Sequence, residues 1–184
     1  MGDGDTVILD SGSTTYEIAV ALRRRTGLTV ITNDLRIAKY VAGLPETRLL
    51  VTGGELLGSV FTLVGEHAIT FLGDYTANWA FLGADAIDPV AGITNMNTLE
   101  VPLKRAMITA AAATIVVADS SKLGRRALAR IAGAELSSAA MSQLSKYSRP
   151  GNVAESREVL REVCSHNDPA SSRSSSCRHR CVAA

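Results

Sequence analysis

The chain has 184 residues, of which 46% are hydrophobic and 4% aromatic, with 19 Lys+Arg against 18 Asp+Glu. This apolar fraction is too high for a wholly disordered chain, and the net charge of +1 gives no global electrostatic reason to bind nucleic acid or an anionic membrane. No apolar run reaches the roughly 20 residues of a membrane span, and the acidic N-terminus does not resemble a signal peptide, so we expect a soluble, cytoplasmic protein.

The first third of the chain alternates between two kinds of apolar pattern. Short apolar runs predict strands over 6–10, 28–32 and 48–52. Apolar residues at helical spacing predict helices over 14–25 and 34–42. The order strand, helix, strand, helix, strand is typical of a parallel sheet with crossover helices.

The same alternation continues through the middle of the chain. The pattern predicts a helix or an irregular segment over 61–72, a strand over 78–83, a helix over 98–112 and a strand over 114–118. Continuously apolar strands are typical of a sheet that is covered on both faces. We therefore predict an α/β fold with a mainly parallel, Rossmann-like sheet and helices on both faces.

The last part of the chain has a different composition. The net charge is −2 over 1–136 and +3 over 137–184. The sequence from residue 165 onward is rich in Ser and Arg and lacks apolar periodicity, which predicts disorder. Residues 152–163 have apolar residues at helical spacing, which predicts a short, marginally stable helix. We predict one domain over 1–136, followed by an irregular or partly helical tail.

All three cysteines and two of the three histidines lie in this tail. Zinc-type ligands occur in two short motifs, Cys164-x-His166 and Cys177-x-His179-x-Cys181, but their spacing fits no usual zinc motif. The tail's arginines suit at most weak, non-specific contact with nucleic acid. We therefore predict no metal and no cofactor.

Small or polar residues follow five of the predicted strands, at the point where each strand ends. The carboxyl ends of parallel strands meet at one edge of a sheet, where ligands of such folds bind. In DSGSTT (residues 10–15), hydroxyls and a glycine stand at a helix start, where free amides and the helix dipole suit an anion such as phosphate. The alternative is a helix that these hydroxyls cap, with no ligand. The glycine patterns of Walker and dinucleotide-binding loops are absent.

Several charged residues near these strand ends have both a binding and a structural interpretation. Lys122 either neutralises an anion or lies in a solvated basic loop. Asp85 either binds sugar hydroxyls, or acts as a base, or belongs to a turn. Glu100 and Lys104 either point into the crevice or form an exposed i,i+4 pair. His67 is the lone histidine of the domain, and no Ser-His-Asp set can be assembled with it.

The motifs along residues 2–132 resemble those of the C-terminal effector-sensing domain of DeoR-family transcriptional regulators. The matching segments, in chain order, are GDTVILDSGSTT, LTVITNDLRIA, LLVTGGEL, LVGEHA, AFLGADAID, GITNMNTLEVPLKRAMI and VVADSSKLGRRALARIA. The resemblance implies a fold like that of ribose-5-phosphate isomerase and glucosamine-6-phosphate deaminase. It also implies that the domain binds a phosphorylated sugar or related metabolite, and that binding changes the operator affinity of a separate helix-turn-helix domain.

The resemblance also implies which residues of this chain hold the effector. The phosphate loop comprises Ser11, Gly12, Ser13, Thr14 and Thr15, and the other site residues are Asp10, Asn33, Gly53, Gly54, Asp85, Glu100, Lys104 and Lys122. Asp85 and Lys122 look similar to active-site positions of the isomerase. The isomerase has a further lysine soon after its GAD motif, and residues 87–97 contain none. A binding site therefore fits better than isomerase or deaminase activity.

The sequence departs from the family pattern at both ends. The family's DNA-binding domain precedes GDTV, and this chain contains no helix-turn-helix, so we expect contact with DNA only through a domain missing here. After residue 136 the expected strand is replaced by unrelated sequence, as a reading-frame change or a truncated gene would produce. A non-functional remnant is therefore a further alternative to a working sensor domain. A missing strand would leave a sheet edge open and favour homo-oligomers.

Overall fold

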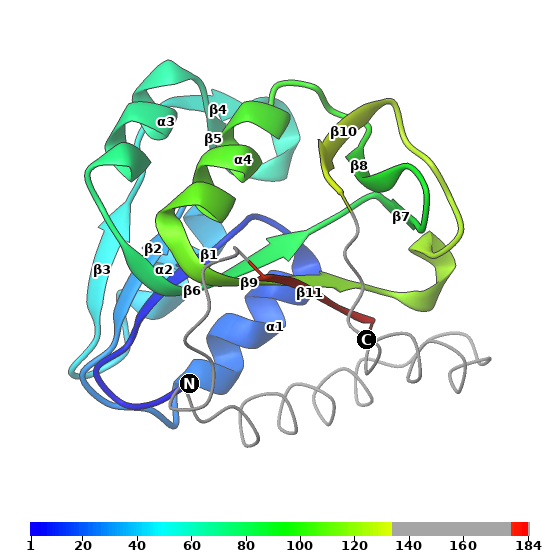
Figure 1. Cartoon of the computed structure of the whole chain (residues 1–184). Helices are drawn as coiled ribbons and strands as arrows, with labels where there is room; N and C mark the ends of the chain where they lie inside the picture. Colours follow the sequence, from blue (N-terminus) through cyan, green and yellow to red (C-terminus); the bar gives the residue numbers. More distant parts are fainter. Residues whose placement is uncertain (134–177, 184) are drawn as a thin grey trace.

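The computed structural model describes residues 1–133 and 178–183 (Figure 1). Its centre is a six-stranded sheet in which all neighbouring strands run parallel. In spatial order the strands are β11 (Arg178–Ala183), β9 (Ala111–Ala118), β6 (Ala77–Gly83), β1 (Thr6–Leu9), β2 (Thr29–Thr32) and β3 (Arg48–Val51). The predicted α/β class with a mainly parallel sheet is confirmed.

Helices cover both faces of this sheet because successive strand residues point to opposite sides. Helices α1 (Ser13–Leu22) and α2 (Leu35–Val41) pack on one face, and α3 (Glu66–Gly73) and α4 (Val101–Ala110) pack on the other (Figure 1). Within β1, Val7 and Leu9 belong to the buried cluster under α1 and α2, whereas Ile8 belongs to the cluster under α3 and α4. Strands with two buried faces explain the continuously apolar runs in the sequence.

Two smaller sheets flank the central one, and the sequence patterns do not predict them. An antiparallel hairpin consists of β4 (Glu55–Leu57), the 3-10 turn η1 (Gly58–Val60) and β5 (Thr62–Val64). The other sheet consists of β7 (Ala86–Asp88), β8 (Gly92–Asn95) and β10 (Ala129–Ala132), and a second 3-10 turn, η2 (Ser120–Lys122), precedes β10. The segment 61–72, predicted as helical or irregular, splits into β5 and α3. Strands β4, β5 and β7 have three residues each, too few for periodicity to reveal, and the pairing of both small sheets is decided by tertiary contacts.

The end of the chain differs from the prediction of disorder after 165. Residues Arg178–Ala183 form β11, which pairs in parallel with residues 113–118 of β9. The edge of β9, expected to stay open, is therefore covered. Backbone N–H and C=O groups make this ladder, so the Ser/Arg-rich composition did not exclude it. The helix expected over 152–163, and the residues Cys164, His166 and Cys177, lie outside the described residues.

In the described part of the chain, no helix is both long enough and apolar enough to cross a membrane. The same residues contain no cluster of three or more His, Cys, Asp or Glu side chains that could hold a metal ion.

Candidate functional site at the carboxyl edge of the sheet

The loop between β1 and α1 reaches the edge of the sheet where the parallel strands end. Gly12 is the N-cap of α1 with a φ of 144°, a backbone conformation that side-chain-bearing residues rarely adopt, and no side chain caps the helix. The Thr15 hydroxyl instead donates to the Gly12 carbonyl oxygen over 2.9 Å. The predicted capping of α1 by hydroxyls is therefore wrong, because the cap position is held by a residue without a side chain. The first-turn amides keep the capacity to bind an anion.

A carboxylate from the neighbouring strand end approaches this loop. The Gly12 amide donates to Asp34 Oδ2 over 3.4 Å, and Asp34 is the N-cap of α2. Arg36 Nη2 donates to the same oxygen over 2.7 Å, and this hydrogen bond raises the pKa of the guanidinium against the effect of burial. Sequence reasoning missed both residues as site candidates, although an Asp before a helix is a known capping signal.

The predicted residues Asp10 and Lys104 meet in a buried ion pair rather than at an exposed helix face. Lys104 Nζ donates to Asp10 Oδ2 and, over 3.1 Å, to the carbonyl oxygen of Gly83 at the end of β6. The exposed fractions of the two side chains are 3% for Lys104 and 1% for Asp10. The Gly83 amide also donates to Asp10 Oδ2, over 3.0 Å. The ends of β1 and β6 and the helix α4 are thereby joined through one carboxylate.

Glu100 lies beside this pair, one turn earlier in the chain. Its Oε2 is 3.7 Å from Lys104 Nζ and accepts a hydrogen bond from Asn95 Nδ2 over 3.2 Å. Burial raises the pKa of Glu100, because the attraction of Lys104 and the hydrogen bond from Asn95 offset the loss of water only in part. One lysine therefore serves two carboxyl groups in this cluster.

Two buried side-chain oxygens at this edge have no hydrogen-bond partner among the described residues. They are Asp10 Oδ1 and Asn33 Oδ1. The amide nitrogen of Asn33 donates to the carbonyl oxygen of Leu63 in β5 over 3.2 Å, so only its oxygen is left over. An unpartnered acceptor out of contact with water is unusual in folded proteins and calls for an explanation.

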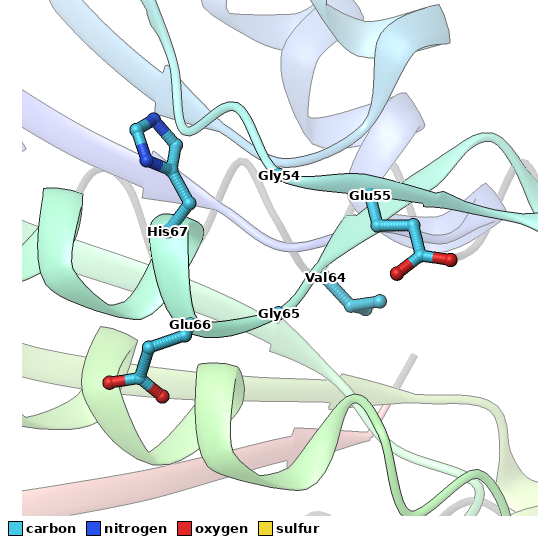
Figure 2. Close-up of a pocket in the computed structure, with 6 residues that line it drawn as sticks. All are labelled: Gly54, Glu55, Val64, Gly65, Glu66 and His67. Atoms are coloured by element: carbon cyan, nitrogen blue, oxygen red, sulfur yellow. The ribbon is translucent and has the colours of Figure 1, made fainter.

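The glycines Gly53 and Gly54 shape the turn between β3 and β4. A Cβ atom on Gly54 would lie 2.4 Å from the Val64 carbonyl oxygen, and its φ is 108°, so only glycine fits without strain. A pocket of about 420 Å³ opens here, lined by Gly54, Glu55, Val64, Gly65, Glu66 and His67 (Figure 2). His67 and Glu66 project from the start of α3 to opposite sides. Of the predicted site residues, only Gly54 lines this pocket.

Two predicted residues bind partners outside the loop before α1. Asp85 is exposed and its Oδ2 accepts from the Met96 amide over 2.7 Å, across the antiparallel pair of β7 and β8. Lys122 Nζ is 3.8 Å from Asp119 Oδ2. Burial acts to raise the pKa of Asp119, but hydrogen bonds from Ser121 and the charge of Lys122 outweigh it, so the pKa is below its usual value. The described contacts do not link Lys122 to the loop before α1.

A family model and several curated proteins match this chain. The family model described as the DeoR C terminal sensor domain matches residues 1–141. The chain is 40% identical over 128 residues to the putative aga operon transcriptional repressor of Escherichia coli O157:H7, across 70% of this chain and 48% of that protein. It is 30% identical over 126 residues to the glycerol-3-phosphate regulon repressor of Escherichia coli K12, across 68% of this chain and 50% of that protein.

Solved structures include chains with a similar arrangement of elements. Ribose 5-phosphate isomerase from Plasmodium falciparum aligns with a TM-score of 0.47 and 14% identity, across 67% of this chain and 46% of that one. The chain spans about half the length of the curated relatives it matches.

Proposed function

The chain belongs to the family of DeoR C-terminal sensor domains, and from that premise we propose that it binds a phosphorylated sugar or related metabolite at the carboxyl edge of its sheet. The observation that carries the proposal is the N-terminus of α1, where Gly12 holds the cap position and no side chain of the described residues caps the helix. These amides and the positive end of the helix dipole would receive the phosphate.

The proposed site comprises the residues predicted from the sequence, together with Arg36. The loop residues Ser11, Gly12, Ser13, Thr14 and Thr15 would hold the phosphate, and Asp10, Asn33, Gly53, Gly54, Asp85, Glu100, Lys104 and Lys122 would line the remainder. Lys104 is already paired with Asp10. Arg36 is paired with Asp34, but its side chain is 43% exposed against 3% for Lys104, so it is the more accessible positive charge near the loop.

The interactions available are sufficient for a metabolite sensor. A charge-assisted hydrogen bond contributes about 1.5–3 kcal/mol, and a micromolar Kd requires about 8 kcal/mol. Three or four such bonds from backbone amides, with further bonds to sugar hydroxyls, reach that value. This arrangement favours binding over catalysis, because Asp85 accepts from a backbone amide and Lys104 is paired with Asp10, so neither is free to act as a general acid or base.

We propose that the domain over residues 1–136 senses the effector and does not turn it over. The relatives are named as transcriptional repressors, and by analogy effector binding would alter operator affinity of a helix-turn-helix domain that lies outside these 184 residues. The site of action would then be the cytoplasm, and the working form a homo-oligomer.

The experiment is isothermal titration calorimetry of the full chain against a panel of sugar phosphates and inorganic phosphate. The variant Ser13→Glu places a carboxylate at the first position of α1, where it competes with phosphate but interacts favourably with the helix dipole. We expect it to lose binding while keeping its thermal stability. The matched variant Ser13→Gln has the same size without the charge and should keep binding.

The alternatives give different results. Turnover of an aldose or ketose phosphate would show an isomerase or deaminase instead of a sensor. Absence of cooperative thermal unfolding in the wild-type chain would show a non-functional remnant. Equal binding by Ser13→Glu and Ser13→Gln would remove the end of α1 as the phosphate site.

A further inference from the structure

The residues that carry the two unpartnered oxygens, Asp10 and Asn33, follow paired strands of the central sheet. Leu9 of β1 is opposite Thr32 of β2 in the parallel register, so the residues that follow them, Asp10 and Asn33, are neighbours where the two strands end. Side chains alternate between faces. Asp10 and Asn33 therefore lie on the face that α3 and α4 cover, the same face as Ile8 and Ile31.

Among the described residues, several donors near these two strand ends are already engaged elsewhere. Lys104 and the Gly83 amide both donate to the other oxygen of Asp10, Oδ2. The Thr32 hydroxyl donates to the Leu9 carbonyl oxygen, and the Thr52 hydroxyl to that of Gly53. Each of the two acceptor side chains is 1% exposed, so bulk water does not satisfy them either. Both oxygens therefore keep an unused capacity to accept a hydrogen bond.

Asn33 is hydrogen-bonded to the strand that contributes a lining residue to the pocket. Asn33 binds Leu63 through both its side-chain nitrogen and its backbone oxygen, and the next residue, Val64, lines the pocket of about 420 Å³ (Figure 2). Asp10 lies two residues before Gly12, at the foot of the loop whose amides face the phosphate. Asn33 is therefore linked to β5 beside the pocket, and Asp10 to the loop before α1.

We propose that Asp10 Oδ1 and Asn33 Oδ1 form a hydroxyl-reading subsite, which accepts hydrogen bonds from a hydroxyl group of the effector while its phosphate binds at the start of α1. This rests on the proposed function for the position of the phosphate. The effector is then a polyol or sugar phosphate with a free hydroxyl, and a plain alkyl phosphate is a poor ligand. The carboxylate of Asp10 repels a phosphate from this subsite, so the ligand binds in one orientation.

Discrimination should be large, because the two acceptor residues are each only 1% exposed. A ligand without the hydroxyl leaves both acceptors unpartnered, whereas water satisfies exposed acceptors at no cost. We expect a polyol phosphate to bind about tenfold to a hundredfold more tightly than the alkyl phosphate of equal length, the range for one hydrogen bond to a charged acceptor. Inorganic phosphate, which reaches only the loop, should bind more weakly than the polyol phosphate.

The test is calorimetry of the full chain with polyol phosphates of three, five and six carbons, each paired with the alkyl phosphate of equal length. The variant Asn33→Ala removes one acceptor and should reduce the polyol-to-alkyl affinity ratio at least severalfold, while affinity for inorganic phosphate stays the same. Asn78→Ala, at the opposite end of β6 where Asn78 Oδ1 accepts from the Thr6 amide, is the matched control and should keep the ratio.

The possible failures are distinguishable. If polyol and alkyl phosphates of every length bind equally well to the wild-type chain, the hydroxyl-reading subsite is wrong and the phosphate site stands. If Asn33→Ala keeps the full affinity ratio, the subsite is equally wrong. If no phosphate compound binds to the folded wild-type chain, the proposed function fails and the inference fails with it. Discrimination in the wild-type chain alone supports the subsite even where Asn33→Ala does not fold.

Discussion

The buried pair between Asp10 and Lys104 allows a quantitative test of how the loop before α1 is held. Replacing Lys104 by Met keeps the length of the side chain and removes its charge. Asp10 would retain only the Gly83 amide as partner of its Oδ2, with 1% of the side chain exposed to water. The carboxylate would then be a buried, uncompensated charge.

The size of the effect follows from this burial. Removing one partner of a buried ion pair costs about 3–5 kcal/mol, against at most about 1 kcal/mol for an exposed pair. Both side chains are at least 97% buried by their exposed fractions of 3% and 1%, so the larger range applies. At about 2–4 °C per kcal/mol for a chain of this size, Tm should fall by about 6–20 °C.

Thermal unfolding followed by circular dichroism measures this change. Lys39→Met, an exposed lysine on α2, is the control and should change Tm by no more than a few degrees. The double variant Asp10→Asn with Lys104→Met removes both charges and should recover much of the lost stability. A fall for Lys104→Met no larger than that of the control, or additive losses in the double variant, would refute the reasoning.

Three further predictions concern neighbouring features. Glu100→Gln removes a carboxyl group whose pKa burial raises above its usual value of 4.5. Because the folded state holds that proton more tightly than the unfolded state, the wild type should lose stability relative to the variant as pH rises above about 4.5. Parallel Tm curves of the two proteins from pH 4 to 8 would contradict this. Gly54→Ala should cost about 1–3 kcal/mol in denaturant unfolding because of its φ of 108°, whereas Gly73→Ala, with open space around it, should be neutral. Asp34→Asn removes a negative charge 3.4 Å from the Gly12 amide. Phosphate binding in calorimetry should tighten a few-fold, since a charge at a helix end is worth about 0.3–1 kcal/mol. Weaker or unchanged binding would show that the Asp34 carboxylate does not compete with phosphate for the end of α1.

The sequence alone predicted the parts of the fold that local patterns encode. The strands around Val7, Val30 and Phe81 are continuously apolar because both sides of each strand are buried, and this shows in the residue order. The polar residues after these strands are predicted to share one edge simply because the strands are parallel. The family resemblance rests on the same motifs, and the match over residues 1–141 confirms it.

The tertiary structure decided which of these residues meet and in what state. Lys104 looked like half of an exposed helical pair with Glu100, yet its main partner, Asp10, is 94 residues away in the chain. The approach of Asp34 to Gly12, the hairpin of β4 and β5, and the pairing of β11 with β9 depend equally on distant segments. Periodicity reports only which side of an element faces the core. The two unpartnered oxygens, on which the proposed recognition of the effector depends, belong to residues that follow the paired strands β1 and β2 and that the folded chain buries.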